Sequence, residues 1–240
     1  MRTATYKSIR DSVLRKMGLD AAQAVMPSQA AALADYIESA LSDAWSLYDW
    51  PQTTKSESRT PAVATIDFDN EIGEILRITD LEPSSSRLVQ TFLFETNDDS
   101  TAATITDSRY TAGSEVYVKY RTPEPRLTGE DYSASTTYTP GDVVYHDATG
   151  DCYLCILAST GNAPTSATHW IRQRIPAVFA AYTRAAAHAA TLEEDGQYDK
   201  AQFQLVKAEA ELVKAHDDTF FRQNNTPLTW SLQREAVTPY

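Results

Sequence analysis

Apolar positions follow helical spacing near both ends of the chain and strand-like spacing between them. Apolar residues three and four apart predict a short helix over residues 4–17, and Gly18 suits its C-terminal end. A longer helix is expected to begin at Pro27 and to end before Pro51. Residues 1–51 are therefore interpreted as a helical segment.

The spacing of apolar residues changes from helical to strand-like after residue 51. Runs such as "AVATIDF", "IGEILRI" and "EVYVKYR" are rich in β-branched and aromatic residues, and polar loops separate them. Residues 52–127 are therefore predicted to form an antiparallel β-region, either a sandwich or a small barrel. Residues 131–171 follow as a small β-module, because four of the eight glycines lie between Gly129 and Gly161 and indicate closely spaced turns.

Helical spacing returns over residues 172–222. Pro176 suits the first turn of a helix that runs to Asp195 and Gly196. A second helix is predicted from Asp199 to Phe221, and the short break at Gly196 predicts an antiparallel hairpin. In the second helix, apolar residues recur at intervals of three and four and predict a short coiled-coil-like seam: Phe203, Val206, Ala210 and Val213.

The predicted fold class is α+β. We expect the two N-terminal and two C-terminal helices to form a four-helix bundle, with the β-region and the β-module as excursions from it. Such excursions cost little, because loops tolerate long insertions.

Residues 223–240 lose this periodicity and are expected to form an extended C-terminal tail. A free tail is one interpretation, and a tail that becomes ordered on a partner is the other, since Trp230 is a large apolar side chain in a polar segment. The residues expected to dock on that partner are Pro227, Leu228, Trp230, Leu232 and Tyr240.

Charge and composition exclude several classes of function. The net charge of −12 argues against a general nucleic-acid coat and against binding to anionic membranes. Arg184 and His188 interrupt the longest apolar-leaning stretch, residues 175–190, so no membrane span is expected. The hydrophobic content of 42% is sufficient for a packed core.

No residue pattern predicts catalysis, a cofactor or a metal. Cys152 and Cys155 form a single C-x-x-C pair, and on a continuous strand their side chains would point to opposite faces. The four histidines show no metal-ligand spacing, and no nucleophile or phosphate-binding motif is present. The acidic run at residues 193–195 could form a carboxylate site, but a solvated turn or a subunit contact is favoured. The protein is not expected to be an enzyme.

The β-module resembles the small chitin/cellulose-binding modules of bacterial chitinases. The matching positions are Tyr132, Tyr138, Gly141, Asp142, Val144, Tyr153, Gly161, Pro164 and Trp170. The resemblance implies that Tyr132, Tyr138, Tyr153 and Trp170 could contact a glycan or a neighbouring protein; the alternative is that they form the core of the module. Leu157 and Ala158 replace the exposed aromatic pair of the family, which favours a protein contact over a sugar.

The remainder of the chain resembles the head–tail connector, or adaptor, proteins of tailed bacteriophages. The similarity is clearest in "IPAVFAAYTRAAAHAATLEEDGQYDKAQFQLVKAEAELVKAHDD" and is also present in "DAWSLYDWP". It implies a structural virion protein at the neck, assembled in the host cytoplasm. The implied partners are further copies of the chain in a ring, commonly a dodecamer, together with the portal protein and a tail nozzle or tail tube protein.

The resemblance also implies that double-stranded DNA passes through the ring without sequence-specific binding, and that the C-terminal segment docks on the portal. The alternative function is that of a carbohydrate-binding protein that acts through residues 132–170. A third interpretation, an enzyme with an accessory module, would need a pocket of convergent titratable residues.

Overall fold

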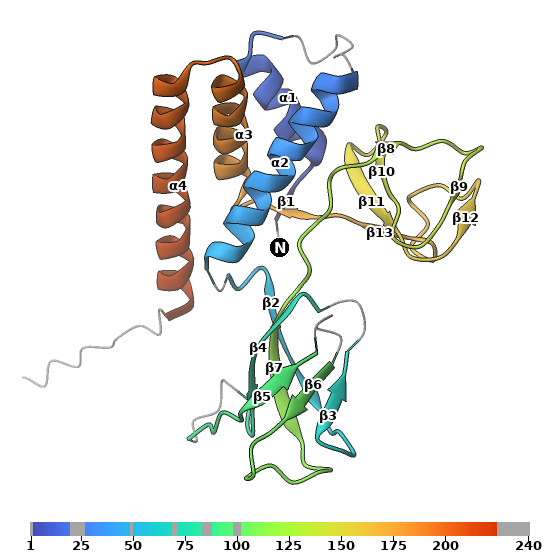
Figure 1. Cartoon of the computed structure of the whole chain (residues 1–240), viewed down its shortest axis with the longest axis vertical. Helices are drawn as coiled ribbons and strands as arrows, with labels where there is room; N and C mark the ends of the chain where they lie inside the picture. The colour runs from blue at the N-terminus through green and yellow to red at the C-terminus, as the bar shows by residue number, and fades with distance from the viewer. Residues whose placement is uncertain are drawn as a thin grey trace, which may run out of the picture.

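The computed structural model of the chain describes residues 2–19, 27–48, 50–68, 72–82, 88–97 and 102–224, with only the backbone for residues 27, 28 and 219–224. Within these ranges the fold is mixed α+β, with four helices and several antiparallel sheets (Figure 1). The helices lie together at one end of the molecule, and the two β-rich parts project from them. None of the described helices has the length and apolar character needed to cross a membrane.

The helices are α1 (Tyr6–Lys16), α2 (Pro27–Leu47), α3 (Ala180–Glu194) and α4 (Tyr198–Asn224). All four contribute buried side chains to one hydrophobic core, in which Ile9, Ile37, Phe179 and Leu212 are at most 1% exposed. Thr5 caps α1 by accepting a hydrogen bond from the backbone N–H of Ser8. The four predicted helices are present, and three of them begin within two residues of the predicted position.

The start of α3 differs from the prediction. The helix begins at Ala180, and Pro176 instead belongs to a short strand, β14 (Ile175–Pro176). This strand pairs antiparallel with β1 (Thr3–Ala4), so the N-terminal strand lies beside the segment that leads into α3. Because the strand extends the backbone through Pro176, the helix can begin only after the turn that follows it.

The β-region contains two three-stranded antiparallel sheets. The first has the order β2 (Thr54–Arg59), β7 (Val116–Arg121), β4 (Glu74–Thr79), and the second the order β3 (Thr65–Asp67), β6 (Ala102–Ile105), β5 (Phe94–Thr96). Alternate residues of β7 are buried, as expected when one face of a strand packs on a core. Ile78, Val118 and Ile105 meet in a hydrophobic core of its own, separate from that of the helices.

The β-module has a four-stranded sheet and a two-stranded sheet. The larger sheet has the order β13 (Trp170–Arg172), β11 (Asp151–Cys155), β10 (Val143–His146), β8 (Glu130–Asp131), and the smaller one pairs β12 (Ser159–Thr160) with β9 (Thr137–Tyr138). The β8–β10 pair is parallel, and the other pairs are antiparallel.

The linker between the two β-parts is held on α2. Leu127 is 1% exposed and packs in the helical core. The Oε2 atom of Glu38 accepts hydrogen bonds from the backbone N–H groups of Leu127 and Thr128 and from the Thr128 hydroxyl. The linker is thus anchored by a carboxylate and by a buried leucine.

Candidate functional site

The outer face of α4 exposes large apolar side chains. Phe203 is 69% exposed, Val206 56% and Val213 44%, and Ala210 between them is also exposed. We call these four residues the α4 stripe. The opposite face of the helix buries Ala201, Ala208 and Leu212, and the last two pack in the helical core. The residues of the predicted seam therefore lie together on the exposed face of α4, and smaller residues make the buried contact of this helix.

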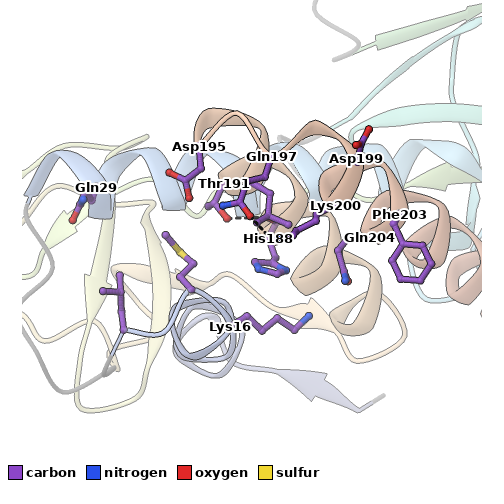
Figure 2. Close-up of a pocket in the computed structure, with 13 residues that line it drawn as sticks. Lys16, Gln29, His188, Thr191, Asp195, Gln197, Asp199, Lys200, Phe203 and Gln204 are labelled. Carbon is purple, nitrogen blue, oxygen red and sulfur yellow. Dashed lines mark hydrogen bonds between the residues drawn. The ribbon is translucent and has the colours of Figure 1, made fainter.

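A pocket of about 700 Å³ lies where the end of α1 meets the turn between α3 and α4. Lys16 from α1, His188 from α3, and Lys200 and Phe203 from α4 are among the side chains that line it (Figure 2). Asp195 and Asp199 lie at the turn end of the same pocket. Phe203 thus belongs both to the α4 stripe and to the rim of this pocket.

Cationic side chains gather beside the pocket from three helices. The pKa of Lys16 is lowered, first by burial and then by the nearby positive charges of Arg184 and Lys207. In the described part of the chain, none of these three cations forms an ion pair with a carboxylate. Together with Lys200 they make a basic cluster, an unusual feature in a chain with a net charge of −12.

His188 faces the pocket from α3 and is partly buried. Its Nδ1 atom is buried and has no hydrogen-bond partner among the described residues. Burial lowers the pKa of the imidazole, and the charge of Lys16 lowers it further. The folded protein therefore favours neutral His188.

The lowered pKa of His188 predicts that the stability of the fold depends on pH. When the pH falls from 7 to 5, unfolded His188 takes up a proton near its ordinary pKa of about 6.5, while folded His188 resists protonation. The free energy of unfolding should therefore fall over this range, and His188→Gln should make the fall smaller. Urea unfolding at several pH values measures this, with His169→Gln, in the β-module, as the matched control. Equal pH slopes for wild type and His188→Gln would contradict the assignment.

The four aromatic residues proposed as contacts of the β-module lie mainly in its interior. Tyr138 is 8% exposed, Tyr153 5% and Trp170 2%, and Tyr132 is partly buried against them. The rings of Tyr138 and Trp170 meet edge to face with their centroids 5.2 Å apart. This burial favours the core interpretation, since a sugar needs an exposed ring face on which to stack.

The two cysteines point to opposite sides of β11. Cys152 faces the helical core and Cys155 faces the core of the β-module, as the alternation of side chains along a strand predicts. Both are free thiols, and burial raises the pKa of Cys152 to about 12. Across the residues described, no group of three or more His, Cys, Asp or Glu side chains is arranged to hold a metal ion.

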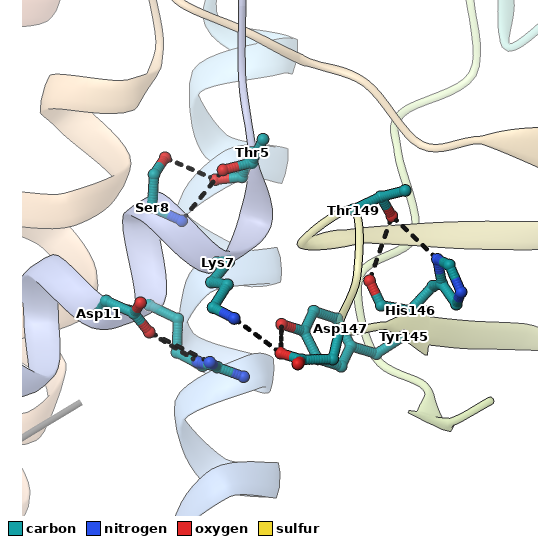
Figure 3. Close-up of polar contacts among 9 residues, drawn as sticks. Thr5, Lys7, Ser8, Asp11, Tyr145, His146, Asp147 and Thr149 are labelled. Atoms are coloured by element: carbon teal, nitrogen blue, oxygen red, sulfur yellow. Dashed lines mark hydrogen bonds and ion pairs between the residues drawn. The ribbon is translucent and has the colours of Figure 1, made fainter. Parts of the chain in front are cut away.

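The β-module is fixed to α1 by several contacts (Figure 3). Lys7 forms an ion pair with Asp147 at 2.7 Å, and its backbone N–H donates to the carbonyl of Gly150 at 2.8 Å. Gly150 has a φ of +72°, and a Cβ there would lie 2.9 Å from the Cβ of Lys7. The Arg10 guanidinium lies 5.2 Å from the ring centroid of Tyr145. The module is therefore packed firmly against α1.

The remaining predicted residues are dispersed. Glu193, Glu194 and Asp195 are exposed at the end of α3, and only Asp195 of the three reaches the pocket. The predicted docking residues Pro227, Leu228, Trp230, Leu232 and Tyr240 lie outside the described residues. Sequence reasoning missed the basic cluster, because Lys16, Arg184 and Lys207 are far apart along the chain and only folding brings them together.

No family model matches this chain, and no curated protein shows significant similarity to it.

Proposed function

We propose that this protein is a head–tail adaptor of a tailed bacteriophage, a structural virion protein that forms a homo-oligomeric ring between the portal and the tail. In this proposal the four helices make the bundle that forms the body of each subunit. The β-region and the β-module extend from this body toward the tail or the outside, where the tail nozzle or tail tube protein binds.

The observation that carries the proposal is the α4 stripe. Phe203, Val206 and Val213 are each more than two-fifths exposed on one continuous helix face. A contiguous apolar surface of this kind is typical of a face that another protein covers. A protein whose work is assembly needs such a face on each subunit.

Charge and burial are consistent with the same role. The net charge of −12 would prevent a ring from holding the DNA that passes through it, because carboxylates repel phosphates. The carbohydrate-binding alternative loses support, since Tyr138, Tyr153 and Trp170 have almost no exposed ring surface. The exposed large apolar side chains of the module are aliphatic: Ile156, Leu157 and Ile171.

The proposal also assigns portal docking to residues 223–240, which would fold on binding. Mass photometry of the chain mixed with the portal protein of the same phage is expected to show a complex of fixed stoichiometry. A chain that lacks residues 223–240 should stay folded and lose portal binding. Trp230→Ala should weaken portal binding strongly, and Leu93→Ala, on a leucine that is 70% exposed in the β-region, should not.

Portal binding that is unchanged after truncation would exclude the tail as the docking element. A full-length protein that never joins the portal would exclude the adaptor function itself.

A further inference from the structure

The pocket beside α4 is lined by two lysines and by the aspartates Asp195 and Asp199 at its turn end, and further cations gather beside one of the lysines. Lys16 and Lys200 line it, and Arg184 and Lys207 lie close to Lys16. Lys200 and Lys207 are two turns apart on α4 and so project from the same side of the helix, about 10 Å apart along its axis. Phe203 lies between them and is 69% exposed. A partner that covers the basic cluster and Phe203 should therefore combine negative charge with some apolar area.

The other side of the helical layer carries the complementary charges. Asp43 of α2 and Glu209 of α4 are both exposed, and both lie close enough to the buried Tyr182 of α3 to raise the pKa of its hydroxyl, after the larger effect of burial. One turn beyond Asp43, Leu47 is 56% exposed. Helix α2 contains acidic residues but no lysine or arginine. We call Asp43, Leu47 and Glu209 the acidic face.

A single copy of the chain cannot join these two surfaces. Arg184 belongs to the basic cluster, and Tyr182 lies beside the acidic face. These residues are two positions apart on α3, and side chains with this spacing point about 200° apart around a helix axis. The same separation holds on α4 between Lys207 and Glu209. The basic cluster and the acidic face therefore lie on opposite sides of the α3–α4 hairpin.

Two copies of the chain, however, can bring these surfaces together. The basic cluster of one copy can meet the acidic face of the next. Such a contact joins two different surfaces, is repeated from copy to copy, and closes into a ring when the rotation between copies allows it. Opposite faces of one layer are also the faces that neighbouring subunits of a ring present to each other.

We propose that a second copy of this chain occupies the surface formed by the basic cluster and the α4 stripe, and that it binds through Asp43, Leu47 and Glu209 of its acidic face. The inference rests on the proposed function for the ring, and it adds the identity of the two surfaces that close it. The charges set the register of the two copies, and the apolar residues contribute the buried area.

Charge reversal tests this contact in the full-length protein. Wild type is expected to self-associate, more weakly as salt is raised, as measured by sedimentation velocity over a range of concentrations. Lys207→Glu and Asp43→Lys should each weaken self-association by at least roughly tenfold, because each places like charges opposite one another. Lys55→Glu, an exposed reversal on β2, is the matched control and should have little effect. Circular dichroism and thermal unfolding confirm that each variant is folded.

Mixing the two variants is the decisive step. A ring in which Lys207→Glu and Asp43→Lys subunits alternate has opposite charges at every contact, so the mixture should recover the assembly that neither variant forms alone. Failure of the mixture to recover, wild-type association by either variant, or a wild type that remains monomeric would each overturn the inference. A Lys207→Glu variant that assembles normally but no longer binds a DNA duplex would also overturn it, and would identify a phosphate backbone as the occupant.

The outcome is separate from that of the portal experiment. A chain that joins the portal but assembles through other residues would retain the adaptor function and exclude this contact. A chain that assembles through these residues but ignores the portal would retain this contact and exclude the adaptor function.

Discussion

Trp50→Ala is expected to lower the free energy of unfolding by about 3–5 kcal/mol. Trp50 is fully buried, and its ring lies 5.0 Å from that of Phe179 and 5.5 Å from that of Tyr48, measured between centroids. Its Nε1 donates a hydrogen bond to the carbonyl of Ala44 at 2.8 Å. Removal of the ring leaves a cavity where α2, α3 and α4 meet, and it leaves that carbonyl without its indole partner.

Urea unfolding followed by far-UV circular dichroism measures this loss. Tyr198→Ala is the matched control, because it removes an aromatic ring that is 69% exposed at the start of α4; its effect should stay within about 0.5 kcal/mol. Domain stabilities are typically about 5–15 kcal/mol, so the Trp50 variant should unfold at a clearly lower urea concentration. Similar midpoints for the two variants would show that Trp50 does not hold the helices together.

Trp170→Ala is expected to cost a similar amount, about 3–5 kcal/mol, within the β-module. Trp170 is 2% exposed, contacts Tyr138, and donates from Nε1 to the carbonyl of Asn162 at 3.1 Å. The module has few other large buried residues, so loss of this ring should open its sheets. The carbohydrate-binding alternative predicts the opposite, a folded module that has lost only its ligand.

Hydrogen exchange of the amides in residues 131–172 distinguishes these results. We expect faster exchange in β10, β11 and β13 of the variant, while the β-region keeps its protection. Ile171→Ala is the control, since Ile171 follows Trp170 in the same strand but is 43% exposed, and its replacement should have little effect. Unchanged protection in Trp170→Ala would show that the residue is not needed for the module's core.

The sequence predicts the helices better than it predicts their faces. The periodicity of α4 contains two apolar stripes, one of large residues and one built on Ala201, Ala208 and Leu212. Hydrophobicity alone favours the larger side chains for the core, and that choice is wrong here. Alanines let α4 approach the alanine-rich α3 closely, and only this tertiary contact decides which stripe is buried.

Other features depend on contacts that no local pattern reports. The extended backbone at Pro176 exists because Thr3 and Ala4 pair with it from the other end of the chain. The attachment of the β-module to α1 depends on Lys7 and Arg10 meeting a turn and a tyrosine that lie far along the chain. The opposite orientation of Cys152 and Cys155, in contrast, follows from strand geometry and was predictable.

The sharing of one core by helices from both ends of the chain has a consequence for synthesis. Ile9 and Ile37 leave the ribosome early, but Phe179 and Leu212, which complete their burial, come much later. Until then α1 and α2 expose apolar faces, and they stay exposed while the intervening β-parts are synthesised. Contacts between residues so distant along the chain slow folding and prolong this exposure. The nascent chain should therefore depend on chaperones more than a chain of equal length whose core is built from neighbouring elements.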